Sequence, residues 1–137
     1  MFSRNVSAHE GLRVLLVEDH VRIRQIEFET LENLGYAVDV AATASKALEL
    51  LAKLSYDLVI TDVRLPGELN GIALAQRAKQ FLNRPKTLVV GAHLERYPKE
   101  EVKEVADAVL TKPFTLKDFK SNVAALIGVP PHDDMAD

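Results

Sequence analysis

Acidic and basic side chains follow three short apolar runs of the sequence, close to the point where each run ends. Glu18 and Asp19 come directly after LRVLLV, Asp62 follows LVIT, and Lys112-Pro113 follows AVL after one further residue. Three carboxylates at one edge of a sheet repel one another unless a cation lies among them. Carboxylates suit Mg²⁺, and Lys112 would supply a second positive charge. This combination favours phosphoryl transfer, in which Asp62 attacks phosphorus and forms an acyl phosphate.

Each of these features also has a simpler interpretation when it is taken alone. An acidic pair after a strand is commonly a solvated helix start, because carboxylates suit the positive end of the helix dipole. A single aspartate at a strand end is commonly a turn or cap residue, and a Lys-Pro pair is commonly part of a loop. Three separate strand ends that point to one edge of the same sheet favour the chemical interpretation.

Five apolar runs have the length and composition of buried strands. They are residues 12–17, 37–41, 58–61, 87–90 and 108–110. Helical stripes lie between and after them. Their members are Ile23, Ile26, Thr30, Leu31 and Leu34; Ala44, Ala47, Leu48 and Leu51; Leu74, Ala75, Ala78, Phe81 and Leu82; residues 101–106; and Leu116, Phe119, Val123, Leu126 and Ile127. Gly35 would end the first helix, Thr43 would cap the second, and Thr115 with Asp118 resembles a capping box.

Strands that alternate with helices predict an α/β protein with a parallel sheet covered by helices on both faces. Right-handed crossovers then require a doubly wound sandwich. The working site of such a fold lies beyond the carboxyl ends of the strands, which is where the charged residues are expected.

Length and composition fit one domain of a soluble protein. The chain has 137 residues, 47% of them apolar, and a formal net charge of −3, which gives no electrostatic reason to expect a nucleic-acid partner. The absence of cysteine excludes disulfides, thiolate metal sites and a cysteine nucleophile. No signal-like or membrane-spanning run is present, so we expect a cytoplasmic protein without a membrane partner. We expect a disordered tail at residues 1–11, one domain at 12–127 and a polar tail at 128–137.

Three motifs resemble those of the response-regulator receiver family. They are LLVEDH at residues 15–20, LVITDVRLPGELNG at 58–71 and VLTKPF at 109–114, and the resemblance extends over about residues 12–127. It implies a flavodoxin-like fold, in which a five-stranded parallel sheet of strand order 2-1-3-4-5 is packed with five helices. It also implies a phosphoacceptor protein of a two-component phosphorelay, which is no enzyme beyond its own phosphorylation and dephosphorylation.

The resemblance assigns roles to matching positions. Asp62 would be the phosphorylated residue. Asp19 would bind Mg²⁺ directly, Glu18 largely through water, and Arg64 through its backbone carbonyl, with Asp62 completing the metal site. Lys112 would contact the incoming phosphoryl group.

The family also implies a cis bond between Lys112 and Pro113 that would aim the lysine, since cis bonds are rare outside X-Pro. The phosphoryl donor would be a sensor histidine kinase or a histidine phosphotransfer protein. The downstream partner would be another protein, and the chain would be a monomer or a weak homodimer.

Two positions depart from the family pattern. Gly91 stands where the family usually has threonine or serine, and Val109 stands where it usually has tyrosine or phenylalanine. Both positions belong to the family's conformational switch. The missing hydroxyl and the missing aromatic ring predict that phosphorylation is coupled more weakly to the far face of the domain. Ala92, His93 and Pro113 would be neighbours of the site. His93, Tyr97 or a backbone amide at Gly91 or Ala92 is a candidate to substitute for the missing hydroxyl, but the simpler interpretation, that both side chains are ordinary loop or helix-start residues, is favoured.

Three functions remain open at this point. The first is a phosphoacceptor without an output domain of its own, since only about ten residues follow the last helix, too few for an independent core. The second is a phosphorylation-independent binding module of the same fold, which the two departures favour. The third is a magnesium-dependent phosphatase, which would need a second acid where Arg64 stands.

Overall fold

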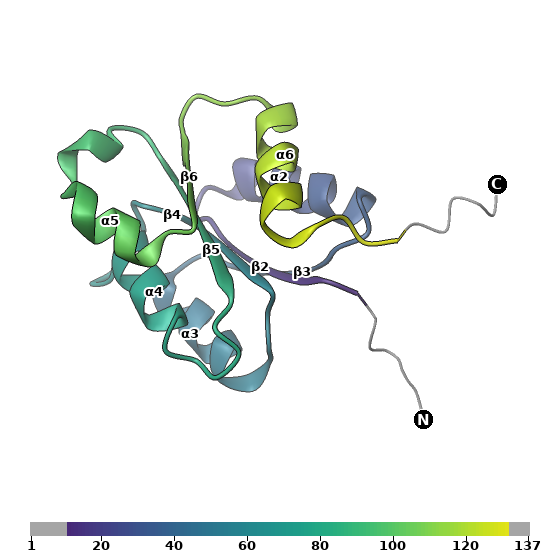
Figure 1. Cartoon of the computed structure of the whole chain (residues 1–137), viewed down its shortest axis with the longest axis horizontal. Coiled ribbons are helices and arrows are strands. Elements are labelled where there is room, and N and C mark those ends of the chain that lie inside the picture. The colour runs from purple at the N-terminus through teal and green to yellow at the C-terminus, as the bar shows by residue number, and fades with distance from the viewer. Residues whose placement is uncertain (1–10, 132–137) are drawn as a thin grey trace.

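The computed structural model describes residues 11–131 and contains a five-stranded parallel sheet (Figure 1). The strands are β2 (Arg13–Val17), β3 (Ala37–Ala41), β4 (Leu58–Asp62), β5 (Lys86–Gly91) and β6 (Ala108–Thr111). They lie in the order β3-β2-β4-β5-β6, which confirms the expected order 2-1-3-4-5. Val17 pairs with Thr61, Asp62 with Val90, and Gly91 with Thr111. This register brings the carboxyl ends of β2, β4, β5 and β6 to one edge of the sheet.

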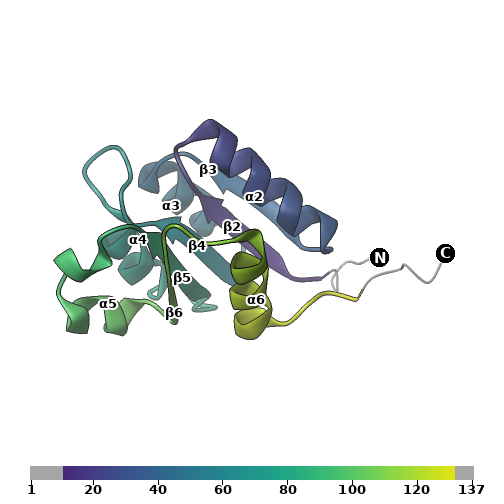
Figure 2. The same ribbon diagram turned by 90° about the horizontal axis from the view of Figure 1, so that it is seen from above.

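Helices cover both faces of the sheet, as Figures 1 and 2 show. The helices are α2 (Val21–Asn33), α3 (Ala44–Lys53), α4 (Gly71–Ala78), α5 (Lys99–Val105) and α6 (Leu116–Ile127), with a short 3-10 helix, η1 (Leu94–Arg96), before α5. Helices α2 and α6 lie on one face, and α3, α4 and α5 lie on the other. The doubly wound sandwich expected from the alternating pattern is therefore confirmed.

The core consists of buried clusters on the two faces. Under α2 and α6, side chains from all five strands of the sheet pack against Leu31, Phe119 and Val123. On the other face, Leu15, Val17 and Val59 pack against α3 and α4, and a further cluster joins α4 and α5. Because the central strands β2, β4 and β5 are covered on both sides, they form a rigid base for the loops at the carboxyl edge of the sheet.

Local signals place the helix ends. The Thr43 side chain accepts a hydrogen bond from the amide of Lys46, and Asn70 caps α4 in the same way through the amide of Ala73. The capping box expected at Thr115 and Asp118 is present at the start of α6. Such caps satisfy amides that have no partner within the helix.

Three of the expected helical stripes are partly wrong. In the last of them, Leu116 at the start of α6 is 43% exposed. Ile26, which we expected to be buried, is 49% exposed, and Glu27 is buried in its place. Glu27 lies four residues from both Ile23 and Leu31, so the inward face of α2 follows that spacing instead. Leu82 is fully exposed because α4 ends at Ala78, and helical periodicity no longer applies beyond that point.

Among residues 11–131, none of the helices has the length and apolar character that crossing a bilayer requires. Most of the two expected tails falls on residues 1–10 and 132–137, which lie outside the described residues. The predicted domain limits therefore remain predictions.

Candidate functional site

A cleft of about 480 Å³ opens at the carboxyl edge of the sheet. We call it the acidic cleft. It is lined by Glu18, Asp19, His20, Ile23, Asp62, Val63, Arg64, Leu65, Pro66, Gly91, Ala92 and Lys112. The structure thus brings together the acidic pair, the central aspartate and the lysine that the sequence predicted to meet.

Glu18 and Asp19 occupy the turn between β2 and α2. Glu18 is buried, and its carboxylate accepts a hydrogen bond of 3.0 Å from the backbone amide of His20. Its backbone carbonyl accepts a hydrogen bond of 2.9 Å from Nη1 of Arg24. These contacts fix Glu18 at the floor of the cleft, whereas Asp19 is exposed at its mouth.

Asp62 is the last residue of β4 and is 8% exposed. Nζ of Lys112 lies 3.1 Å from Oδ1 and 3.2 Å from Oδ2 of Asp62. The backbone amide of Lys112 donates a hydrogen bond to the carbonyl of Gly91, so the end of β5 positions the lysine beside Asp62. The Lys112–Pro113 peptide bond is cis, as expected.

The donor set of the cleft fits a hard divalent cation. One oxygen from each of Glu18, Asp19 and Asp62 lies within 4.8 Å of the others. Burial, reinforced by the neighbouring carboxylate of Asp62, raises the pKa of Glu18 to about 7, although the His20 amide opposes this change. The three acids therefore concentrate more negative charge than Lys112 alone balances. Oxygen ligands of this kind suit Mg²⁺, which would relieve that excess.

Gly71, the first residue of α4, allows the loop after Asp62 to pass close to this helix. A Cβ atom at this position would lie 1.9 Å from the carbonyl oxygen of Asp62. We expect Gly71→Ala to lower the free energy of unfolding by about 1–3 kcal/mol, because backbone must move to relieve the overlap. Denaturant unfolding followed by circular dichroism measures this change.

Gly91→Ala is the matched control for that substitution. A Cβ atom at Gly91 would meet side-chain atoms, at 3.2 Å from Cβ of Val63 and 3.4 Å from Cδ2 of Leu94. These can shift more readily than backbone, so the loss of stability should be smaller. Equal losses in the two variants would contradict the close approach of Gly71 to Asp62.

The two atypical switch positions lie on neighbouring strands, and Val109 pairs with Val89, two residues before Gly91. Gly91 is buried at the end of β5, and Val109 is 41% exposed on β6. The side chain of Leu94 packs next to Gly91, in the space that a larger side chain at this position would need. No sequence pattern predicts this contact, because Leu94 lies in the three-residue helix η1, which is too short to show periodicity.

The other expected neighbours of the site divide between two places. Ala92 lines the acidic cleft, whereas His93 and Pro113 line the pocket beside it. Nδ1 of His93 lies 3.7 Å from a carboxylate oxygen of Glu95, and Tyr97 packs against the apolar cluster between α4 and α5. Neither of these two side chains lines the acidic cleft, so neither replaces the missing hydroxyl in this conformation.

Glu27 is the residue near the site that the sequence analysis missed. Burial, with smaller contributions from Glu18 and Asp62, raises its pKa to about 7. The sequence contained a pattern that could have predicted this burial, since Glu27 lies midway between the apolar residues Ile23 and Leu31, four residues from each.

Comparison with known proteins identifies the family. Residues 14–124 match the model of the response regulator receiver domain. The chain therefore belongs to the response regulator receiver domain family, whose members act in two-component systems and interact with histidine kinases or phosphotransfer proteins.

Curated relatives are longer than this chain. The chain is 30% identical over 122 residues to the sensor histidine kinase RcsC of Salmonella typhi, covering 88% of this chain and 13% of RcsC. It is 33% identical over 117 residues to the transcriptional regulatory protein PmrA of Pectobacterium parmentieri, covering 85% of this chain and 52% of PmrA. The chain thus spans about half or less of the length of these relatives.

Solved structures show the same fold. The response regulator TrrA of Thermotoga maritima, in complex with Mg²⁺-BeF, is 28% identical with a TM-score of 0.75, covering 85% of this chain and 99% of that one. The receiver domain of a sensor histidine kinase from Pseudomonas aeruginosa PAO1, with a magnesium ion coordinated in its active-site cleft, is 25% identical with a TM-score of 0.75. It covers 86% of this chain and 98% of that one.

Proposed function

We propose that this receiver domain accepts a phosphoryl group on Asp62 from a histidine kinase or a histidine phosphotransfer protein. The observation that carries the proposal is the contact of both Asp62 carboxylate oxygens with Nζ of Lys112, within a cleft that also holds Glu18 and Asp19. A nucleophilic carboxylate, a neighbouring ammonium and two further acids are the groups that phosphoryl transfer to aspartate needs.

Asp62 and Lys112 would have separate roles in the transfer of the phosphoryl group. A carboxylate oxygen of Asp62 attacks phosphorus while the bond from phosphorus to the donor nitrogen breaks, and the product is an acyl phosphate. The ammonium of Lys112, already beside Asp62, would pair with a phosphoryl oxygen and offset its charge. Burial of Asp62 at the strand end keeps its carboxylate fixed for the approach.

We propose that Mg²⁺ is the cofactor. Asp19, Asp62 and the backbone carbonyl of Arg64 would hold it directly, and Glu18 largely through water. When bound, the ion would neutralise charge on the phosphoryl oxygens. The magnesium named for two of the similar structures supports this assignment.

The dependence of phosphorylation on magnesium tests the proposal. We expect the wild-type protein to gain one phosphoryl adduct, seen as a shift in intact mass, after incubation with acetyl phosphate and Mg²⁺. Chelation of the metal should remove most of the adduct, because the carboxylates then repel the incoming phosphoryl oxygens. An adduct of equal yield in chelator and in magnesium would contradict the metal assignment.

A phosphorylation-independent binding module is the second candidate. The observation in its favour is Gly91, which offers no hydroxyl to a phosphoryl group and is packed against Leu94. No adduct in magnesium, even with rapid quenching, would favour this function. A phosphorylated protein would instead catalyse only its own phosphorylation and dephosphorylation, as proposed here.

A cytoplasmic location, a monomeric or weakly dimeric state and a downstream protein partner remain predictions from the sequence. So does the expectation that neither nucleic acid nor membrane is bound.

A further inference from the structure

Lys112 lies between two cavities at the carboxyl edge of the sheet. One is the acidic cleft, and the other is a pocket of about 810 Å³ beside it, which we call the side pocket. Asp62 lines the acidic cleft, Glu27 lines the side pocket, and Lys112 lines both. The lysine is therefore placed between an acid that it contacts and a second acid that it does not contact.

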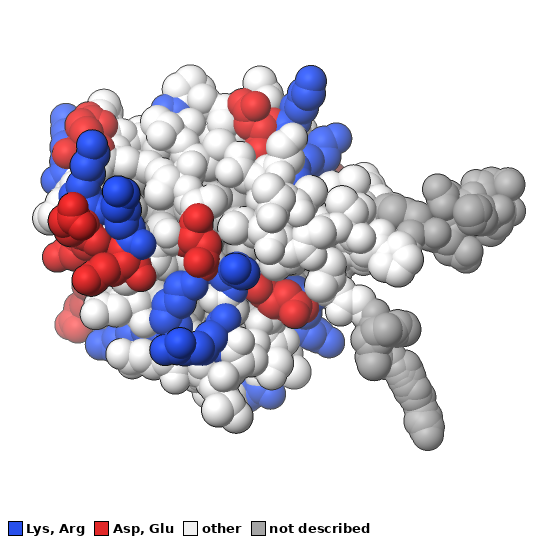
Figure 3. Space-filling model, viewed as in Figure 1, with Lys and Arg blue, Asp and Glu red and all other residues white. Residues whose placement is uncertain are grey.

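Glu27 is an unusual residue for the buried side of α2. It is 5% exposed, and none of the hydrogen bonds or ion pairs among residues 11–131 involves its side chain. By contrast, Figure 3 shows charged side chains of both signs gathered on the surface over α5, where water and neighbouring opposite charges screen them. A buried carboxylate without a partner is costly, so Glu27 gains from any cation that can reach it.

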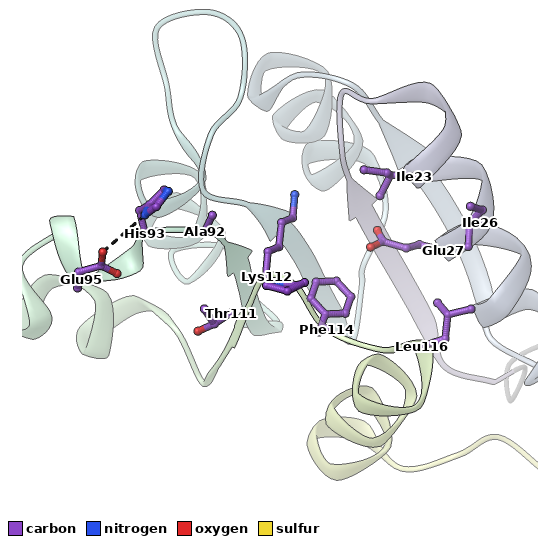
Figure 4. A pocket seen from close by; sticks show the side chains of 11 residues that line it. Ile23, Ile26, Glu27, Ala92, His93, Glu95, Thr111, Lys112, Phe114 and Leu116 are labelled. Atoms are coloured by element: carbon purple, nitrogen blue, oxygen red, sulfur yellow. Dashed lines mark ion pairs between the residues drawn. The ribbon is translucent and has the colours of Figure 1, made fainter.

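The side chain of Glu27 is turned toward the lysine. Figure 4 shows its carboxylate directed away from α2, toward the side of Lys112 and Phe114. Burial raises the pKa of Glu27 to about 7, and the ammonium of Lys112 opposes this rise, so the two charges already attract each other across the side pocket. Among residues 11–131, Lys112 is the one lysine or arginine that lines the side pocket.

The present position of Lys112 occupies the oxygens that the proposed metal and the phosphoryl group need. Nζ of Lys112 lies 3.1 Å from Oδ1 and 3.2 Å from Oδ2 of Asp62. A metal cation that binds one of these oxygens repels an ammonium group so close to it. The lysine must then move, and its compact charge is carried on a flexible four-carbon stem that allows this. A free carboxylate on the other side of the lysine would stabilise the displaced charge.

We propose that Glu27 is a positioning residue of the phosphoacceptor site, which receives the ammonium of Lys112 when Mg²⁺ binds at Asp62 and before the phosphoryl group arrives. This inference rests on the proposed function, because it requires that Asp62 binds the metal. The movement frees a carboxylate oxygen of Asp62 for attack. It also keeps the ammonium beside the site, from where it can turn to a phosphoryl oxygen. Because Glu27 lowers the cost of displacing the lysine, it should strengthen the binding of Mg²⁺.

The affinity for Mg²⁺ alone tests this inference. At about pH 8.5, where Glu27 is ionised, Glu27→Gln should weaken Mg²⁺ binding about three- to tenfold, as measured from the shifts of amide resonances. Glu32→Gln, an exposed change on the same helix, should bind Mg²⁺ as the wild type does. In a Lys112→Met background, Glu27→Gln should change the affinity by less than about twofold, because no ammonium is left to receive. Equal affinity of wild type and Glu27→Gln, or equal weakening in both backgrounds, overturns the inference.

The contact between the two side chains gives a second, spectroscopic readout. The nuclear Overhauser effect between the ε-methylene of Lys112 and the γ-methylene of Glu27 should strengthen when Mg²⁺ is added, and an unchanged or weaker effect overturns the inference. Adduct formation from acetyl phosphate reports on the proposed function separately. An adduct together with unchanged Mg²⁺ affinity in Glu27→Gln would keep the proposed function and remove the role of Glu27. A wild-type protein that neither binds Mg²⁺ nor forms an adduct would contradict both.

Discussion

The Asp62→Asn protein is expected to form no phosphoryl adduct under conditions in which the wild type is labelled. The amide of asparagine is a poor nucleophile and cannot form an acyl phosphate, so the loss should be complete rather than partial. The adduct is measured as a shift in intact mass of both proteins after incubation with acetyl phosphate and Mg²⁺. The fold should remain, because Asp62 makes its strand contacts through its backbone.

Asp57→Asn is a suitable control for this experiment. Asp57 is an exposed aspartate just before the other end of β4, and its carboxylate accepts a hydrogen bond from the amide of Arg13. This variant should be labelled as well as the wild type. An adduct that persists in Asp62→Asn would show that another residue is modified and would contradict the assignment of the phosphoacceptor.

Glu27→Gln is expected to change how the free energy of unfolding depends on pH. The folded-state pKa of about 7 lies above the ordinary value of 4.5, so the folded protein binds the proton more tightly than the unfolded chain. The stabilisation from this proton is complete below pH 4.5 and is lost as the pH rises through 7. Glutamine cannot ionise, so the variant does not lose this stabilisation.

The size of the effect follows from the difference in pKa. Between about pH 5 and pH 8.5, the stability of Glu27→Gln relative to wild type should rise by about 2–3 kcal/mol. Denaturant unfolding in magnesium-free buffer measures it, and comparison at two pH values cancels any constant cost of the buried amide. Glu18, Asp62 and Lys112, the charged groups that influence Glu27, are the same in both proteins. Glu32→Gln should show no such trend, and a flat difference for Glu27→Gln would mean that Glu27 is not desolvated.

Much of the site could be predicted from the sequence because its residues stand at strand ends. In a parallel sheet all carboxyl ends share one edge, so three charged strand ends must approach one another whatever the loops do. The residues around the site could not be placed in this way. Leu94 lies next to Gly91 because of the position of the short helix η1, and burial of Glu27 depends on how α2 is rotated against the sheet. Both are decided by packing rather than by local pattern.

The route of the chain through the acidic cleft has a consequence for synthesis. Asp62 ends the central strand β4, and the lysine that contacts it lies 50 residues further along the chain. Contacts between residues so far apart cannot form until the intervening chain has left the ribosome and paired into the sheet. A nascent chain that stops before β6 therefore carries the acidic residues without Lys112, and the proposed phosphoacceptor site is complete only when β6 and Lys112 are in place.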